Sequence, residues 1–311
     1  MRGWWQDFTD LVLPAECGGC GRPRTVLCPE CRAVLSGAAP SRVRPVPEPP
    51  GLPVVHAAAR YADEVRAVLL AHKERGALAL AAPLGTALAG AVQAALGETP
   101  DAAVMGGGMP LLLVPVPSAR AAVRARGHDP ARRIALAAAG ELRRTGIPAR
   151  VLAVLRQRRA VADQAGLNSR QRLDNLAGAL AVAPGGDRLL RGGSVVLVDD
   201  LMTTGASLSE AARALREATA AEEGTGAYGR RAEEAAAHRR NPGLVSYGEA
   251  TTAVYAAAGR ESTGERMAGS AEEGTGCGHA VPGMAGTGDP GDVICAAVVA
   301  APPDSFEINR N

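Results

Sequence analysis

Residues 195–207 combine a hydrophobic run, two acids and a turn rich in hydroxyl groups, in the order Val195-Val196-Leu197-Val198-Asp199-Asp200-Leu201-Met202-Thr203-Thr204-Gly205-Ala206-Ser207. Four consecutive aliphatic residues predict a buried strand, and the periodic segment 207–218 after the turn predicts a helix. Sheets of α/β proteins bind ligands at the carboxyl ends of their strands, which is where the two acids stand. This stretch therefore predicts a strand, a turn and a helix, with a binding site at the turn.

The turn offers two kinds of recognition group. The hydroxyls of Thr203 and Thr204, together with Gly205 and the free amide groups of a helix start, can hold one phosphate. The carboxylates of Asp199 and Asp200 lie at the edge of this cradle and suit a sugar diol or a divalent metal ion. A ligand that carries a phosphate and a neighbouring diol is a ribose 5-phosphate. The alternative is a threonine that only caps the helix, which leaves two adjacent acids at a strand end unexplained.

The segments around this unit alternate between strand and helix patterns. Short hydrophobic runs predict strands at residues 111–114, 151–155, 176–182 and 293–299. Apolar residues at helical spacing predict helices at residues 61–71, 78–96, 130–144 and 207–218. This alternation indicates an α/β domain with a mainly parallel sheet flanked by helices. Because aromatic residues make up only 3% of the chain, we expect a core of Ala, Val and Leu.

Four of the six cysteines lie close together, as Cys17-x2-Cys20-x7-Cys28-x2-Cys31. Two CxxC pairs at this spacing suit a closed, tetrahedral structural zinc site. Four unrelated thiols, or a redox-active CxxC pair, are the alternatives, and neither accounts for two pairs so close together. Because few apolar residues accompany the cysteines, we expect this module, residues 1–38, to need the metal in order to fold.

Two regions of biased composition divide the chain further. Six prolines between Pro40 and Pro53 predict a stiff, extended linker over residues 39–58. We expect this linker to let the cysteine module unfold separately from the α/β domain, residues 59–218, when metal is removed. Residues 219–291 hold 15 of the 38 glycines and repeat the hexapeptide Ala-Glu-Glu-Gly-Thr-Gly. They predict a low-complexity insertion, disordered or weakly helical, before the last strand and tail at 292–311.

Charge and hydropathy exclude some classes of protein. The chain has 34 basic and 32 acidic residues, a net charge of +2, which excludes a globally basic nucleic-acid-binding protein. No uninterrupted apolar run approaches the roughly 18–20 residues needed to cross a bilayer, so we expect no membrane insertion. Asp7 and Asp10 interrupt the apolar stretch that a signal peptide requires, so we expect a cytoplasmic protein.

The strand, acid pair, Thr-Thr-Gly turn and helix resemble the loop by which phosphoribosyltransferases bind phosphoribosyl pyrophosphate (PRPP). The four-cysteine module resembles one branch more closely, the ComF family of competence-associated proteins, including its GntX-like members. Further motifs that resemble this branch are Pro115-Val116-Pro117, Arg124-Ala125-Arg126-Gly127 and the set Gln164, Leu167, Arg170 and Asn175. The resemblance covers residues 11–36, 59–218 and 292–301. Asp129 departs from the usual Asn, and the insertion before the last strand leaves the edge of the sheet undefined.

The resemblance implies a type I phosphoribosyltransferase-like fold and Mg²⁺-dependent transfer of phosphoribose from PRPP to a nitrogen acceptor, with release of pyrophosphate. Asp199 and Asp200 would be catalytic, and the whole segment Val198–Ser207 would bind PRPP. The pyrophosphate would bind Pro117, Ser118, Ala119, Arg120, Arg124 and Arg126. A flexible lid over residues 156–175 would exclude water from the reaction, with contacts from Gln164, Arg170, Arg172 and Asn175. The sequence does not identify the acceptor.

Positive charge is concentrated in the same region. Between Arg120 and Arg172 there are 13 arginines against three acids, Asp129, Glu141 and Asp163, a local net charge of +10. A polyanion such as PRPP would bind there. His128, a lone histidine in a loop, and Lys73, which lies outside any recognised motif, are assigned no catalytic role.

A second hypothesis is a protein without catalysis. The same fold would then sense PRPP or a nucleotide, or assist DNA uptake, with a competence helicase or single-stranded DNA as partner. A second copy of the chain is a further candidate partner. Single-stranded DNA grooves use aromatic side chains for base stacking, and Tyr61 is the only aromatic residue between residues 59 and 218. This disfavours stacking but leaves contact with a phosphate backbone open.

Overall fold

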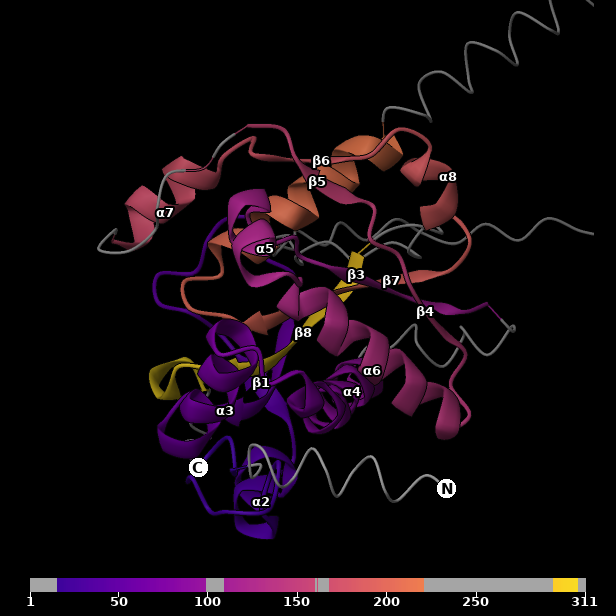
Figure 1. Cartoon of the computed structure of the whole chain (residues 1–311). Helices are drawn as coiled ribbons and strands as arrows, with labels where there is room; N and C mark the ends of the chain where they lie inside the picture. Colours follow the sequence, from indigo (N-terminus) through magenta and orange to yellow (C-terminus); the bar gives the residue numbers. More distant parts are fainter. Residues whose placement is uncertain (1–15, 99–108, 160, 162–167, 221–292, 307–311) are drawn as a thin grey trace, which may run out of the picture. The chain divides into compact units, whose positions relative to one another are not determined.

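The computed structural model describes residues 16–98, 109–159, 161, 168–220 and 293–306. Their central feature is a six-stranded sheet with the strand order β1-β2-β8-β7-β3-β4 (Figure 1). The strands are β1 (Ser41–Val43), β2 (Val55–Arg60), β3 (Leu111–Pro115), β4 (Ala149–Val151), β7 (Ser194–Leu201) and β8 (Val293–Ala301). Neighbouring strands are parallel except β1 and β2. The mixed α/β class with a mainly parallel sheet is confirmed. Most of the predicted insertion and the tail beyond residue 306 lie outside the described residues.

The described residues contain the four predicted helices, each within three residues of its predicted ends, and four further ones. They are α2 (Pro29–Ser36), α3 (Asp63–Glu74), α4 (Ala81–Gly97), α5 (Arg120–Arg126), α6 (Pro130–Arg144), α7 (Ser169–Leu176), α8 (Gly186–Leu190) and residues 206–220, with 3₁₀ turns η1 (Leu78–Leu80) and η3 (Pro303–Ser305). Helix α6 matches its prediction at both ends. Its start is fixed locally, because the Asp129 side chain accepts a hydrogen bond of 3.2 Å from the Arg132 amide and Pro130 occupies the first turn.

Both faces of the central strand β7 are buried, which explains its unbroken hydrophobic run. Val196 and Val198 pack in one core cluster, with side chains of α4 and α6. Val195 and Leu197 point to the other face and pack in a second cluster, with residues of the helix 206–220. Successive side chains of a strand alternate between the two faces of a sheet, and parallel sheets are commonly covered on both. The strand thus delivers its polar end from the interior of the domain.

The core is built from Ala, Val and Leu, as the composition predicts. Small side chains allow α4 and α6 to approach closely. A Cβ atom added to Gly85 of α4 would lie 2.4 Å from the Ala137 Cβ and 2.8 Å from the Ala138 amide nitrogen of α6. Because real Cβ contacts are never so short, the glycine is required by the distance between these helices.

One helical stretch of the described chain, Leu78–Gly97, is long and apolar enough to cross a membrane by length and composition. In this structure 61% of its most apolar window is buried inside the protein. It comprises η1 and α4, which pack against α6, β2 and β8. The core contacts of this helix therefore account for its apolar composition.

The structure differs from the prediction of an extended linker over residues 39–58. Strand β1 pairs antiparallel with β2 in this range, and β2 continues into the parallel sheet beside β8. Val43 and Val55 are both buried. The prolines fall around and between the two strands rather than within them, which lets the strands pair because proline cannot donate to a sheet ladder. These residues are part of the domain.

Two predicted strands also differ from the structure. The run 151–155 is split between β4 and β5 (Leu155–Gln157), and the segment 176–182 forms a strand only at β6 (Leu180–Val182). Strands β5 and β6 make a separate two-stranded antiparallel sheet. The predicted last strand is confirmed as β8, which lies inside the sheet between β2 and β7. Its seven described and buried residues, 295–301, fit this interior position.

Candidate functional site

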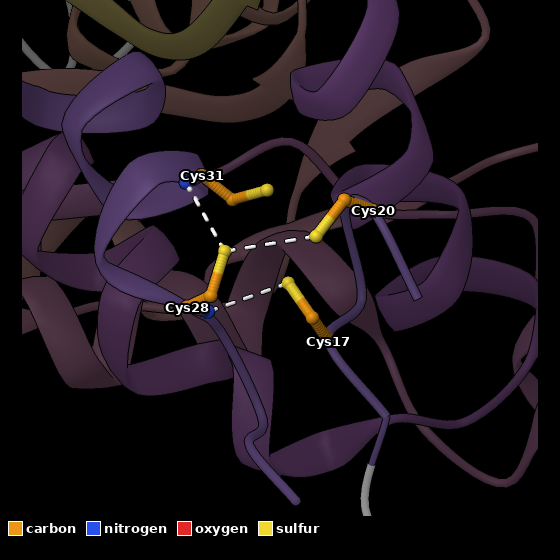
Figure 2. Close-up of side chains that lie close together, drawn as sticks. All are labelled: Cys17, Cys20, Cys28 and Cys31. Atoms are coloured by element: carbon orange, nitrogen blue, oxygen red, sulfur yellow. Dashed lines mark hydrogen bonds between the residues drawn. The ribbon is translucent and has the colours of Figure 1, made fainter. Parts of the chain in front are cut away.

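The four predicted cysteine ligands converge, as Figure 2 shows. The sulfur atoms of Cys17, Cys20, Cys28 and Cys31 all lie within 4.8 Å of one another. The Cys20 and Cys28 sulfurs are 3.7 Å apart, close to the edge of about 3.8 Å that a tetrahedron of thiolates has when each zinc–sulfur bond is about 2.3 Å. The donor type, number and spacing fit a structural zinc ion.

Backbone amides support thiolates in this cluster. The Cys28 amide donates to the Cys17 sulfur at 3.3 Å, and the Cys31 amide to the Cys28 sulfur at 3.5 Å. Burial raises the pKa of Cys17, but the amide hydrogen bonds lower it by more, so that its pKa is about 6. Burial raises the pKa of Cys31, and a bound cation would reverse this effect.

The cysteine cluster belongs to the core of the α/β domain. Cys17, Cys28 and Cys31 are buried in the same hydrophobic cluster as Leu80 and Leu84 at the start of α4. Helix α2, which carries Cys31, contacts α3, α4 and β2. The module is therefore not a separate unit joined by a spacer, and metal at this site would stabilise the sheet domain directly.

The acid pair lies at the carboxyl end of β7. Asp199 is half-buried and Asp200 is buried. The Asp200 amide donates to the Asp199 Oδ1 at 2.8 Å, and the Asp200 Oδ2 lies 2.9 Å from the Lys73 Nζ of α3. Burial and the charge of Asp200 raise the pKa of Asp199 well above its usual value, against the opposing charge of Lys73. The two carboxylates repel each other, and the positive charge of Lys73 opposes this repulsion.

The turn after β7 separates side chains that face solvent from those in the core. The side chains of Met202 and Ala206 are buried in the core, so only their backbone groups are available to a ligand at the turn. Thr203 is exposed and Thr204 is half-buried. Gly205 has a φ of +74°, a conformation that favours glycine over other residues. The helix begins at residue 206, so its free amides lie beside this turn.

A cleft of about 380 Å³ joins the acid pair to the turn. This acid-pair cleft is lined by Lys73, Val116, Pro117, Ser118, Ala119, Arg126, Gln157, Val161, Leu176, Leu180, Asp199, Asp200, Leu201, Thr203 and Ser207. It contains nine of the predicted site residues, from the loop after β3, the end of α5, the end of β7 and the turn and helix start that follow β7. The predicted residues Val198, Met202 and Ala206 are buried in the core instead. The acid-pair cleft falls within the usual size range of small-ligand sites.

A second cleft of about 440 Å³ shares a wall with the first. It is lined by Pro117, Ser118, Arg120, Val123, Arg124, Asp129, Leu155, Arg156 and Gln157. The predicted pyrophosphate-binding arginines are therefore divided, with Arg126 in the acid-pair cleft and Arg120 and Arg124 in this arginine cleft.

The predicted lid residues are only partly placed. Gln164 lies outside the described residues. The Arg172 guanidinium of α7 lies 3.5 Å from the Thr203 hydroxyl, which brings α7 beside the turn. Arg170 is exposed, and the Asn175 carbonyl accepts a hydrogen bond of 2.9 Å from Arg159. Among these residues, Arg172 is the one that the described structure brings to the turn.

Comparison with known proteins does not name the family of this chain. No family model matches it. No curated protein matches it either. The function of this chain has therefore to be inferred from its fold, its cysteine cluster and its two clefts.

Lys73 is the site residue that sequence reasoning missed. Its ion pair with Asp200 joins residues 127 positions apart, a contact that no local spacing can reveal. The one available signal was that Lys73 is the only lysine among 34 basic residues. His128 does not line the acid-pair cleft. Its ring nitrogens Nδ1 and Nε2 each lie 3.2 Å from a backbone carbonyl oxygen, of Arg126 and His72 respectively. These contacts give His128 a structural position.

Proposed function

We propose that this chain is a ComF-like phosphoribosyltransferase, which binds PRPP in the acid-pair cleft and transfers phosphoribose to a nitrogen acceptor. The observation that carries the proposal is the convergence of two carboxylates, three hydroxyls and an arginine on one cleft. This cleft lies at the carboxyl ends of β3 and β7, the usual ligand position of α/β sheets.

The acid pair and the turn would bind the ribose 5-phosphate part of the ligand. Asp199 and Asp200 present carboxylate oxygens to the ribose hydroxyls, and hydrogen bonds to charged groups contribute about 1.5–3 kcal/mol each. The 5′-phosphate would lie against Thr203, Thr204 and Ser207, where the free amides of the helix 206–220 favour an anion.

The loop after β3 would bind the pyrophosphate part. Ser118, Ala119 and Arg126 all line the acid-pair cleft. Arg120 and Arg124 in the adjoining arginine cleft add positive charge where the leaving group departs. Mg²⁺ bound to the pyrophosphate would neutralise part of its charge as the bond to ribose breaks.

The transfer itself exchanges one bond for another at the ribose C1 atom. The C1–O bond to pyrophosphate breaks, a C1–N bond to the acceptor forms, and the acceptor nitrogen loses a proton to its surroundings. Negative charge at Asp199 and Asp200 stabilises the positive charge that develops on the ribose ring. Positioning Arg172 beside Thr203 allows α7 to cover the ligand, since the two side chains are 3.5 Å apart.

Zinc at the four cysteines would have a structural role in this protein. Three of the four thiols are buried and packed against α4, so the site has little room for a substrate. The ion would hold the loop before α2 against the domain core, at a distance from the reaction.

The release of pyrophosphate tests the enzymatic proposal. Purified protein with PRPP, Mg²⁺ and a panel of purine, pyrimidine and amine acceptors should release pyrophosphate with at least one acceptor. Tight PRPP binding without release would favour a sensor of PRPP instead. Binding of single-stranded DNA with a steep salt dependence, and no affinity for PRPP, would favour the role in DNA uptake.

A further inference from the structure

Lys73 is the cation of the acid pair. It stands in the last turn of α3, and its Nζ lies 2.9 Å from the Asp200 Oδ2 and 3.4 Å from the Oδ1. The Asp200 side chain is 8% exposed and the Lys73 side chain 35% exposed, so the pair is shielded but open to the cleft. Asp200 reaches α3 because it continues the face of β7 on which Val196 and Val198 pack.

The other charges that face this pair cancel one another. Arg126 also lines the acid-pair cleft, but its guanidinium lies 3.0 Å from the Glu74 carboxylate. His72, the neighbour of Lys73 in α3, is buried, and burial lowers its pKa, so it is neutral near pH 7. Lys73 therefore compensates two carboxylates, Asp199 and Asp200, and its removal makes the cluster more negative by one charge.

The ion pair of Lys73 and Asp200 opposes the binding of a divalent cation to the acid pair but does not oppose the binding of a sugar hydroxyl. A divalent ion such as Mg²⁺ or Mn²⁺ needs several unpaired oxygen ligands, whereas Lys73 already occupies an oxygen of Asp200 and repels a second cation. A hydroxyl group is neutral and only donates a hydrogen bond, so Lys73 does not oppose it. We propose that Lys73 is a specificity-determining residue, which keeps the acid pair from binding a free divalent cation and reserves it for the hydroxyls of a neutral sugar.

The inference deepens the proposed function, because the sugar it names is the ribose of that proposal. It implies that metal enters the cleft only with a phosphorylated ligand and not ahead of it. The charge of Lys73 also lowers the pKa of Asp199, against burial and Asp200, which raise it. The lysine thus helps to keep both carboxylates available as acceptors for hydroxyl groups.

Titration with Mn²⁺, followed by the loss of the free-ion electron paramagnetic resonance signal, tests this inference on the zinc-loaded full chain. Manganese suits the test because it prefers oxygen ligands to thiolates. Lys73→Met should bind one Mn²⁺ at least tenfold more tightly than the wild type, about 1.4 kcal/mol. Lys73→Arg should behave as the wild type, and Lys73→Met with Asp200→Asn should lose the gain.

The matched control is Arg66→Met, which removes one positive charge from an exposed position of the same helix. Equal Mn²⁺ affinities for Lys73→Met and Arg66→Met, with both proteins folded by circular dichroism, would overturn the inference. Lys73→Gln, which retains a hydrogen-bond donor, replaces Lys73→Met if that variant does not fold. Failure of both neutral variants to fold, while Lys73→Arg folds, would make Lys73 a structural residue and also overturn it.

A parallel titration with ribose 5-phosphate separates this inference from the function on which it rests. Wild-type protein that does not bind ribose 5-phosphate or PRPP contradicts the proposed function, whatever Mn²⁺ does. An unchanged Mn²⁺ affinity in Lys73→Met contradicts the proposal that Lys73 excludes a free divalent cation, whatever the affinity for ribose 5-phosphate. If both hold, the gain in Mn²⁺ affinity should rise with pH, because protons compete with the metal for the carboxylates.

Discussion

Replacing one buried zinc ligand should destabilise the whole sheet domain. Cys28 is fully buried, its sulfur accepts a hydrogen bond from the Cys31 amide, and it shares a core cluster with Leu80 of η1 and Leu84 of α4. Cys28→Ser leaves three thiolates and a buried hydroxyl. Because the cysteine cluster packs on the domain, we expect one cooperative transition at a lower temperature, not the separate melting of an N-terminal module.

The size of the effect follows from two contributions. An unsatisfied buried hydroxyl costs about 1–3 kcal/mol. Structural zinc contributes about 10–16 kcal/mol in isolated zinc-finger peptides, and we expect at least about 3 kcal/mol of that to be lost with one ligand. In a domain of roughly 150–250 residues each kcal/mol shifts the melting temperature by about 2–4 °C. The zinc contribution alone should therefore lower it by about 6–12 °C or more.

Cys295→Ser is the matched control, because Cys295 is a buried thiol of β8 outside the cysteine cluster. It carries the cost of a buried hydroxyl without loss of metal. Differential scanning calorimetry, with metal content from mass spectrometry, compares the variants with and without a chelator. Chelation should lower the melting temperature of the wild type and of Cys295→Ser by more than that of Cys28→Ser, which has already lost part of the zinc contribution. Equal shifts for the two variants, with no response to the chelator, would refute the reasoning.

Two further predictions concern the core and the acid pair. Gly85→Ala should destabilise the domain by about 1–3 kcal/mol through overpacking against Ala137. Gly90→Ala in the same helix, where an added Cβ meets its nearest neighbour at 3.5 Å, should instead stabilise it by up to about 1 kcal/mol. Urea titration measures both changes in the free energy of unfolding, and changes of the same sign would contradict the close approach of α4 and α6 at Gly85. Because the pKa of Asp199 is raised in the folded protein, the folded state binds more protons than the unfolded one above pH 3.8, and stability falls as pH rises toward the raised pKa. Asp199→Asn should lose this slope, so its melting temperature relative to the wild type should rise as the pH is raised above 3.8; a pH-independent difference would count against the raised pKa.

Local sequence signals predicted those elements whose causes are local. Helix α6 follows from an Asp129 cap, a proline in the first turn and helical apolar spacing, all within residues 129–144. The sulfur cluster follows from two CxxC pairs that lie within a span of fifteen residues. Strand β7 follows from a hydrophobic run that both core clusters bury. In each case the sequence neighbours are also the spatial neighbours.

Contacts between residues far apart in the sequence could not be predicted from local sequence signals. The proline-rich segment around β1 and β2 has the composition of a linker. Its strands form because β2 pairs with β8, a strand more than 200 residues away in the sequence. The pairing of Lys73 with Asp200 likewise joins α3 to β7. The division of the arginines between two clefts depends on how α5 is turned against β5, which periodicity does not specify.

Calorimetric titration with PRPP and Mg²⁺ tests most directly whether Asp199 and Asp200 bind the ribose hydroxyls. The double variant Asp199→Asn with Asp200→Asn should bind PRPP at least tenfold more weakly than the wild type, since each lost charge-assisted hydrogen bond costs about 1.5–3 kcal/mol and about 1.4 kcal/mol is one decade. Asp304→Asn, an exposed acid after β8, should bind as the wild type. Bulk electrostatics alone predicts the opposite, because removing two negative charges favours a polyanion. Equal or tighter PRPP binding by the folded double variant would contradict the central claim that Asp199 and Asp200 hold a phosphoribosyl ligand.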